Sequence, residues 1–213
     1  MSDRLEIAGC TCAPPAATMM SVTPPAWHQP VMVGAVLRWL NPTPGAVMVD
    51  GTVGTGGHSL AILPRLLPDG RLLAIDRDRD TLQLAQSRLT EFEPHVTCIH
   101  DNYRHLPDIL ARAGIARVDG LIVDVGMSSL QVDAAERGFS FSKDGPLDMR
   151  MDPEQDVSAA TLINRLAVED LARILDTLGE ERFARRISQR IVEARRTRPI
   201  TTTTELARVV VQA

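Results

Sequence analysis

Short apolar runs alternate with amphipathic stretches up to Asp124. Four apolar runs predict strands, at 46–50, 71–76, 95–100 and 118–124. The stretches between them have the period of a helix, at about 58–67, 79–91 and 104–113, and a further helical pattern precedes the first strand at 31–40. Nearly continuous apolar strands that alternate with helices are typical of a parallel sheet covered on both faces. The sequence therefore predicts an α/β fold for this part of the chain.

The pattern changes after Asp124. A long polar stretch follows, and residues 135–157 are predicted to be a loop that serves as a lid or as a linker. Amphipathic helices are predicted beyond it, at 158–165, 168–178, 180–196 and 203–212. Residues 1–26 are rich in proline and small residues without a sustained period, which indicates a disordered tail. The expected organisation is this tail, an α/β domain at 27–134, the loop, and a helical domain at 158–213.

The stretch DGTVGTGGHS, residues 50–59, directly follows the first predicted strand. In open parallel sheets this loop is a common ligand site, and glycines there let the backbone approach the ligand. Its glycine spacing departs from the G-x-G-x-x-G fingerprint of dinucleotide sites. A carboxylate at Asp50 would repel a diphosphate but attract the ammonium and sulfonium groups of S-adenosylmethionine. The loop therefore favours S-adenosylmethionine over NAD, and a plain tight turn is the alternative.

Two other predicted strands end in residues suited to hold a nucleoside. Asp76 closes the second strand 20 residues after Gly56, the spacing of an acid that binds a ribose hydroxyl. Tyr103, the only tyrosine of the chain, follows the third strand, where it is placed to stack on an adenine. Asp76 does not discriminate between the two cofactors. Taken singly, Asp76 also suits an ordinary strand-end acid and Tyr103 a packing role.

Asp124 ends the fourth predicted strand, across from the glycine loop. Methyl transfer to an exocyclic amine requires an acceptor that holds the amine in line with the methyl donor. Asp124 is therefore the candidate catalytic residue, and its position also suits contact with the cofactor. The Pro-Pro-aromatic motif that many amino-methyltransferases carry here is replaced by Val125-Gly126-Met127. The alternative is a solvated acid, with Ser128 capping a turn.

Composition narrows the class of protein. The net charge of −4 and pI near 5.7 do not indicate nucleic-acid binding by the chain as a whole. No apolar run approaches the length of a membrane span and the start does not resemble a signal peptide, so a cytoplasmic protein without membrane contact is expected. The three cysteines match neither a disulfide framework nor a zinc site. We expect no metal, free thiols, and Cys98 buried in a strand.

The segment 179–198 has a positive charge unlike the rest of the chain. It contains seven arginines and three acids. Phe183, Ile187 and Ile191 recur every four residues and are predicted to face the core, which leaves the arginines exposed to contact RNA phosphates. The alternative is a salt-bridged surface helix, for example with Glu181 paired to Arg185.

Five stretches together resemble the bacterial 16S rRNA cytosine-N4 methyltransferases. They are HQPVM at 28–32, VDGTVGTGGHS at 49–59, LLAIDRD at 72–78, DVGMSSLQVDAAERGFSFSKDGPLDMRMDP at 124–153 and GEERFARRISQRIVEARR at 179–196. The resemblance implies a Rossmann-like, S-adenosylmethionine-dependent domain with a helical insertion. It implies N4-methylation of a cytosine in the decoding region, with 16S rRNA or the small ribosomal subunit as partner. The implied cofactor contacts are Gly56, Gly57, His58, Asp76, Tyr103, Asp124 and Gln131.

The chain departs from this family mainly at its end. Family members continue with further strands, so we expect a fragment, a truncated gene product or a protein completed by a partner, with a sheet that is incomplete beside the fourth strand. Two other functions stay open from the sequence alone. One is a truncated RNA-binding module without catalysis, and the other is an NAD-dependent oxidoreductase.

Overall fold

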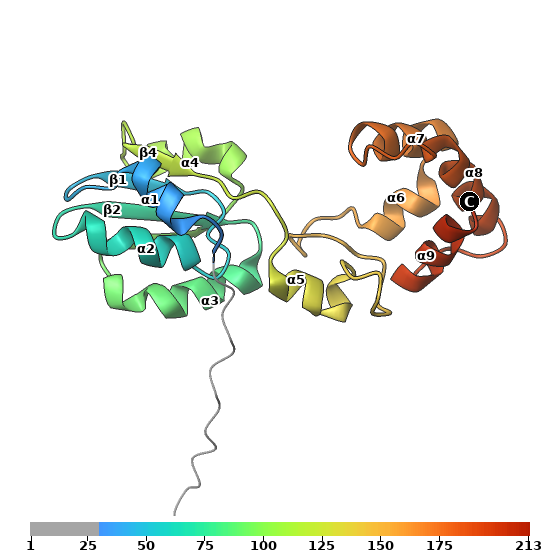
Figure 1. Ribbon diagram of the computed structural model, residues 1–213, viewed down its shortest axis with the longest axis horizontal. Helices are drawn as coiled ribbons and strands as arrows, with labels where there is room; N and C mark the ends of the chain where they lie inside the picture. Colours follow the sequence, from blue (N-terminus) through green and yellow to red (C-terminus); the bar gives the residue numbers. More distant parts are fainter. Residues whose placement is uncertain (1–29) are drawn as a thin grey trace, which may run out of the picture.

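A computed structural model describes residues 30–213, so the tail predicted at 1–26 lies outside the described residues. Figure 1 shows two lobes. One contains the sheet with α1 to α4, the other contains α6 to α9, and the segment with α5 joins them. None of the helices in the described part of the chain is both long and apolar enough to cross a membrane.

The sheet has four parallel strands in the order β3-β2-β1-β4. Their bounds are Val47–Asp50 for β1, Arg71–Asp76 for β2, Val96–His100 for β3 and Gly120–Ile122 for β4. The chain moves outward from β1 to β3 and then returns to the other side of β1. The strand order therefore reverses between β1 and β4, the place where open parallel sheets bind ligands at their carboxyl ends.

β4 is shorter than the predicted 118–124, and a side-chain hydrogen bond holds the backbone at each of its ends. Asp119 accepts a hydrogen bond on its carboxylate from Val47 N at 2.9 Å. At the other end, Asp124 N donates to the Thr52 hydroxyl at 2.7 Å. Within residues 30–213, β4 pairs with β1 alone and forms one edge of the sheet, as expected for the flank of the fourth strand.

Helices cover both faces of the sheet because neighbouring strand residues point to opposite sides. Met48 and Leu72 pack with the buried faces of α2 (Gly57–Leu66) and α3 (Arg79–Leu89), and α1 (Val33–Leu40) adds Leu37 and Leu40 to this cluster. Val49 and Leu73 pack on the other face with α4 (Leu106–Arg112). Cys98 lies in the edge strand β3 and is only half-buried, so its predicted burial is not complete.

The stretch after Asp124 contains more regular structure than predicted. The helix α5 spans Ser129–Asp133, and a 3-10 turn, η3, follows at Ala135–Arg137. Ser128 caps α5: its hydroxyl accepts from Gln131 N, and Gln131 returns a side-chain bond to Ser128 N. This capping box is readable in the sequence as S-x-x-Q. In the alternative interpretation of Asp124, Ser128 caps a turn; in the structure it caps this short helix.

The second lobe has a core of its own. It consists of α6 (Ala159–Arg165), α7 (Val168–Thr177), α8 (Ala184–Arg195) and α9 (Thr203–Val211). Its most buried apolar residues are Leu147, Leu171, Ile187, Ile191 and Ile200. Leu147 comes from the segment predicted as a loop, and its backbone pairs with Thr201 and Ala160. One end of that segment is therefore fixed to the helical lobe.

Candidate functional site

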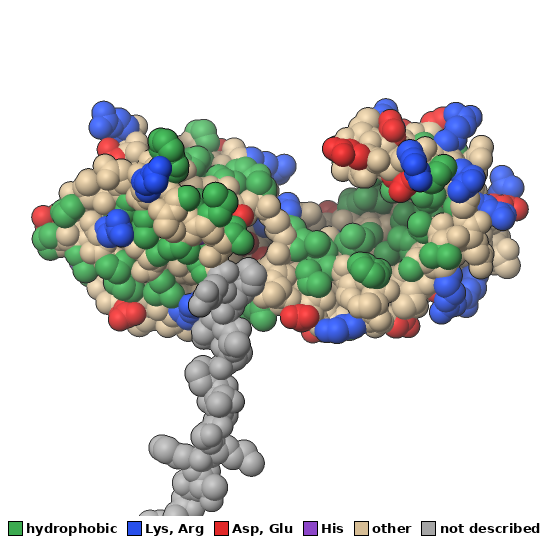
Figure 2. Space-filling view, in the orientation of Figure 1, with side chains coloured by type: hydrophobic (Ala, Val, Ile, Leu, Met, Phe, Trp, Pro, Cys, Tyr) green, Lys and Arg blue, Asp and Glu red, His purple; other side chains and the backbone are tan. Residues whose placement is uncertain are grey.

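A cavity of about 570 Å³ opens at the carboxyl edge of the sheet. Loops after all four strands contribute to its wall, together with α5 and Met151 from the segment that leads to the helical lobe. The face seen in Figure 2 is hollowed between the two lobes. The predicted site residues that line the cavity are Gly57, His58, Asp76, Tyr103, Asp124 and Gln131.

The glycine loop forms one side of this cavity. Gly54 and Gly56 have φ of +53° and +86°, left-handed angles that favour glycine over other residues. Gly56 is the N-cap residue of α2, and a Cβ there would meet Leu89 at 3.5 Å, so this glycine faces the core rather than the cavity. Gly57 lines the cavity and begins the helix, whose first backbone N–H groups have no partner inside the helix.

Asp50 does not face the ligand, so the interpretation of its carboxylate as a direct partner for a cation is wrong. The residue is 1% exposed and is absent from the cavity wall. Its carboxylate accepts from the Ser59 hydroxyl at 2.8 Å and from Thr52 N at 3.2 Å. Burial raises the pKa of Asp50 to about 6, although these two hydrogen bonds oppose the shift. Asp50 therefore joins the glycine loop to the first turn of α2.

Asp76 lines the cavity and organises the loops beside it. One carboxylate oxygen accepts from Gly54 N at 2.8 Å and the other from Asp78 N at 2.9 Å. Burial raises the pKa of Asp76, against the lowering effect of these hydrogen bonds. Each carboxylate oxygen has two lone pairs. Asp76 thus keeps acceptor capacity toward the cavity and suits a ligand with hydroxyl groups.

His58 and Asp124 lie on opposite sides of the crevice between β1 and β4. His58 Nε2 is 3.6 Å from Asp124 Oδ2. The His58 side chain is 8% exposed, and its Nδ1 is buried without a hydrogen-bond partner among the described residues. The side chain of Asp124 is 48% exposed, while its backbone is held by Thr52. Asp124 therefore presents a carboxylate to the cavity on a fixed backbone.

The loop after β3 forms a third part of the wall. Tyr103, 40% exposed, begins the 3-10 turn η2 (Tyr103–His105) and lines the cavity. Asp101 and Asn102 line it as well, which the sequence reasoning missed. A hydrogen bond with the His105 ring is the main cause that lowers the pKa of Asp101 to about 2. Asn102 caps η2: its side-chain oxygen accepts from Arg104 N at 3.0 Å. Their position directly after β3 could have indicated that Asp101 and Asn102 lie at the carboxyl edge of the sheet.

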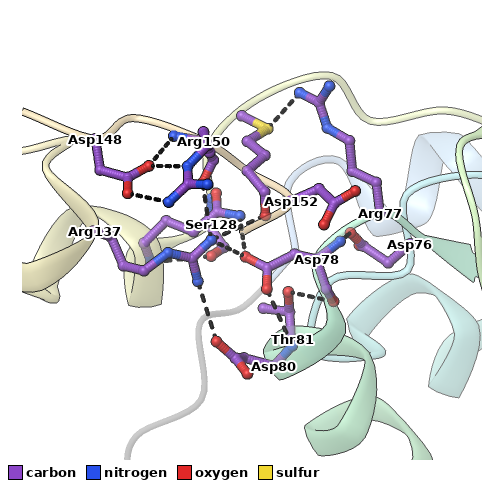
Figure 3. A network of polar contacts seen from close by, with 12 residues as sticks. Asp76, Arg77, Asp78, Asp80, Thr81, Ser128, Arg137, Asp148, Arg150 and Asp152 are labelled. Carbon is purple, nitrogen blue, oxygen red and sulfur yellow. Dashed lines mark hydrogen bonds and ion pairs between the residues drawn. The ribbon is translucent and has the colours of Figure 1, made fainter. Parts of the chain in front are cut away.

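Gln131 belongs to the polar network around Asp78 and Arg137, two residues that Figure 3 labels. Its Nε2 donates to Asp78 Oδ2 at 2.6 Å, and Arg137 Nη2 donates to the same oxygen at 2.8 Å. Asp78 is 1% exposed. Burial favours a higher pKa for Asp78, but the hydrogen bonds from Arg137 and Gln131 outweigh it and lower the pKa. Sequence analysis identified neither Asp78 nor Arg137, because their pairing spans 59 residues of chain.

The fold is that of a Rossmann-like domain, and the cavity lies at the reversal of its strand order. A sequence model of the MraW methylase family matches residues 25–213, and the chain belongs to this family. This membership agrees with the resemblance drawn from the motifs, and it contradicts the alternative of an NAD-dependent oxidoreductase.

Two curated relatives agree with the family. The chain is 49% identical to a ribosomal RNA small subunit methyltransferase H of Syntrophotalea carbinolica, over 86% of this chain and 58% of the relative. It is 47% identical to a protein of the same name from Coxiella burnetii, over 87% of this chain and 61% of the relative. A solved structure, a putative rRNA methylase from Clostridium thermocellum, has 16% identity and a TM-score of 0.41, over 54% of this chain and 66% of that one. The chain thus spans about three fifths of the length of these relatives.

Proposed function

We propose that the cavity binds S-adenosylmethionine and that the protein methylates N4 of a cytosine in the decoding region of small-subunit rRNA. The observation that carries this proposal is the half-exposed carboxylate of Asp124 in a cavity formed by the glycine loop, Asp76 and Tyr103. Membership in a methylase family, with relatives named as small-subunit rRNA methyltransferases, supports the reaction class.

The chemistry of the wall fits this cofactor. Asp76 has acceptor capacity for ribose hydroxyls, and Tyr103 offers an exposed aromatic face for the adenine. The backbone at Gly57, at the start of α2, suits the amino-acid end of the cofactor. The carboxylates in the wall belong to Asp76, Asp101 and Asp124, and they favour a cationic ligand over a diphosphate. When bound, S-adenosylmethionine supplies an electrophilic methyl group.

Asp124 is proposed to act on the nucleotide. The exocyclic amine of cytosine is a hydrogen-bond donor, and a carboxylate is an acceptor with no competing N–H groups. By accepting one amine hydrogen, Asp124 would hold the nitrogen lone pair toward the methyl donor and receive the proton as the new bond forms. His58, 3.6 Å away, limits the positions open to this carboxylate.

The proposal is tested by methyl transfer from radiolabelled S-adenosylmethionine to small ribosomal subunits that lack the modification. We expect label in the rRNA, at N4 of a cytosine when the nucleosides are separated, and calorimetric binding of the cofactor. Cofactor binding without transfer would reject the catalytic proposal for this chain. Binding of rRNA without cofactor binding or methyl transfer would favour the RNA-binding module. Failure to bind S-adenosylmethionine would reject the cavity as its binding site.

The arginines of 179–198 separate into two groups in the structure. Three have intramolecular partners: Arg195 donates to the carbonyls of Ile163 and Leu166, Arg190 pairs with Glu193, and Arg198 pairs with Glu205. Four are exposed and have no ion pair among the residues the structure describes, namely Arg182, Arg185, Arg186 and Arg196. The alternative of a Glu181–Arg185 pair does not hold, since Glu181 instead accepts from Phe183 N.

Phe183 is 42% exposed, and its predicted place in the core is wrong. The helix α8 begins at Ala184, so Phe183 precedes the helical period that buries Ile187 and Ile191. The guanidinium carbons of Arg182 and Arg186 lie 4.7 and 4.6 Å from the centre of its ring. We propose this surface as a contact for rRNA phosphates and bases.

Replacing both Arg182 and Arg186 by Ala is expected to weaken binding to a single-stranded rRNA fragment about tenfold at moderate salt. The slope of log affinity against log salt should fall by roughly 1.4, since two phosphate contacts would be lost. Fluorescence anisotropy at four salt concentrations measures both. The matched control removes Arg173 and Arg190, which are paired with Asp170 and Glu193 in the same lobe. Equal losses in the two double variants would contradict the assignment.

A further inference from the structure

Two parts of the cavity wall come from outside the sheet. Gln131 lies on α5, and Met151 lies on the segment that continues into the helical lobe. Both are fixed by the same pair of residues, Asp78 and Arg137, which do not line the cavity themselves. Asp78 and Arg137 therefore hold two residues of the wall without being part of it.

Arg137 makes the larger number of these contacts. Its Nη2 donates to Asp78 Oδ2 at 2.8 Å, to Met151 O at 2.9 Å and to Arg150 O at 3.2 Å, and its Nη1 lies 3.4 Å from Asp80 Oδ2. The backbone carbonyl of Arg137 accepts from Met149 N at 3.0 Å. One side chain thus joins both ends of the 137–151 segment to the turn between β2 and α3 (Figure 3).

Asp78 fixes the orientation of the Gln131 amide. Its carboxylate takes a hydrogen from Gln131 Nε2 at 2.6 Å, while Gln131 Oε1 accepts from Ser128 N at 3.0 Å. The side chains of Asp78 and Arg137 are 1% and 15% exposed. Removing either partner would leave the other charge with its remaining hydrogen bonds but without its buried ion-pair partner, an unfavourable change.

We propose that Asp78 and Arg137 are positioning residues that hold Gln131 and Met151 in the part of the cavity wall that leads to the helical lobe. The inference rests on the proposed function, since it assigns S-adenosylmethionine to that cavity. It extends the site to two residues that touch neither cofactor nor substrate. Because the sheet lobe and the helical lobe have separate cores, loss of the pair should loosen this wall without unfolding either lobe.

The test is calorimetric binding of S-adenosylmethionine to Arg137→Ala and Asp78→Asn in the 213-residue chain. Each variant is expected to bind about tenfold more weakly, because the wall is no longer held in one geometry. Arg137→Lys should lose less, since it keeps the charge but not the forked contacts. The matched control is Arg79→Ala, which breaks an exposed ion pair with Glu154 across the same junction and should bind within about twofold of the wild type.

A double-mutant cycle separates positioning from a general loss of structure. If Arg137 acts through the wall, Arg137→Ala should cost much less affinity when Gln131 is already Ala, so the two losses would not add. Additive losses, or wild-type affinity in Arg137→Ala, would overturn the proposal.

Hydrogen exchange tests the inference independently of any ligand. In Arg137→Ala, amides of 128–134 and 148–152 should exchange faster, while those of β1, β2 and α8 keep their protection. If the wild-type chain binds no S-adenosylmethionine, the proposed function fails, and unchanged exchange in these two segments would overturn the positioning role by itself.

Discussion

Asp124→Asn is expected to lower the rate of methyl transfer about 10²- to 10⁴-fold, the range typical of a lost proton acceptor. The Asn amide keeps the size of the side chain and one acceptor, but it cannot take up the proton of the target amine. Because the backbone of Asp124 is held by Thr52, the loop should keep its place. Affinity for S-adenosylmethionine should therefore stay within about threefold of the wild type, so the loss would appear in kcat.

The measurement compares initial rates of label transfer at saturating cofactor with calorimetric affinity for the same preparations. Asp156→Asn serves as the control, since it removes an exposed carboxylate on the segment between the lobes and should leave both quantities unchanged. A variant at Asp124 that transfers methyl groups at the wild-type rate would remove this residue from the reaction. A loss confined to cofactor affinity would reassign it to cofactor binding.

The alternation of strands and helices was predictable because burial dictates it. β2 matches its predicted bounds because Leu72 to Ile75 are buried and the polar Asp76 ends the run. The later part of α8 was predictable for a similar reason, because Ile187 and Ile191 lie one turn apart in the core. Its start was not, because the apolar Phe183 fits the same period yet precedes the helix. A period of four residues does not show where a helix begins.

The site was predictable to the extent that it follows from topology. Parallel strands end at the same edge of the sheet, so Asp76, Tyr103 and Asp124 were expected near the glycine loop, and all three line the cavity. Side-chain direction was not predictable from position alone. Asp50 also ends a strand, but the Ser59 hydroxyl in the first turn of α2 draws its carboxylate into the interior.

Long-range side-chain pairs were beyond the sequence reasoning. Asp78 and Arg137 are 59 residues apart, and no local spacing indicates that they meet. Asp78 follows β2 in the same way that a surface acid would. Its burial depends on α5 and the 137–151 segment folding over it, which only the arrangement of the whole chain determines.

Asp50 should make the stability of the sheet lobe fall as pH rises from about 4 to 6. The folded-state pKa of this acid is raised from its ordinary 3.8 to about 6, so the folded protein binds a proton more tightly than the unfolded chain in that window. Protonation of Asp50 therefore stabilises the folded state below pH 4. This stabilisation is lost as the pH rises to the folded-state pKa of about 6, and the unfolding free energy falls by about 3 kcal/mol. In Asp50→Asn this contribution is absent.

The measurement is urea unfolding of both proteins between pH 4 and 7.5, followed by tryptophan fluorescence. The two tryptophans of the chain are Trp27, which lies outside the described residues, and Trp39 on α1, so no tryptophan reports on the helical lobe. The difference in unfolding free energy between the two proteins cancels the other titrating groups. A difference that does not change with pH would show that Asp50 titrates normally.

Ser59→Ala distinguishes burial from hydrogen bonding as the origin of the Asp50 shift. The Ser59 hydroxyl donates to the ionised carboxylate, so its removal should raise the pKa of Asp50 further and extend the pH-dependent loss of stability above pH 6. Above that pH the variant should be less stable than the wild type by about 1.5 to 3 kcal/mol, the range for a lost hydrogen bond to a charged group. At pH 4, where the acid is largely neutral in the folded state, the two proteins should differ less. An equal deficit at both pH values would mean that Ser59 stabilises α2 through packing, and burial alone would then account for the raised pKa.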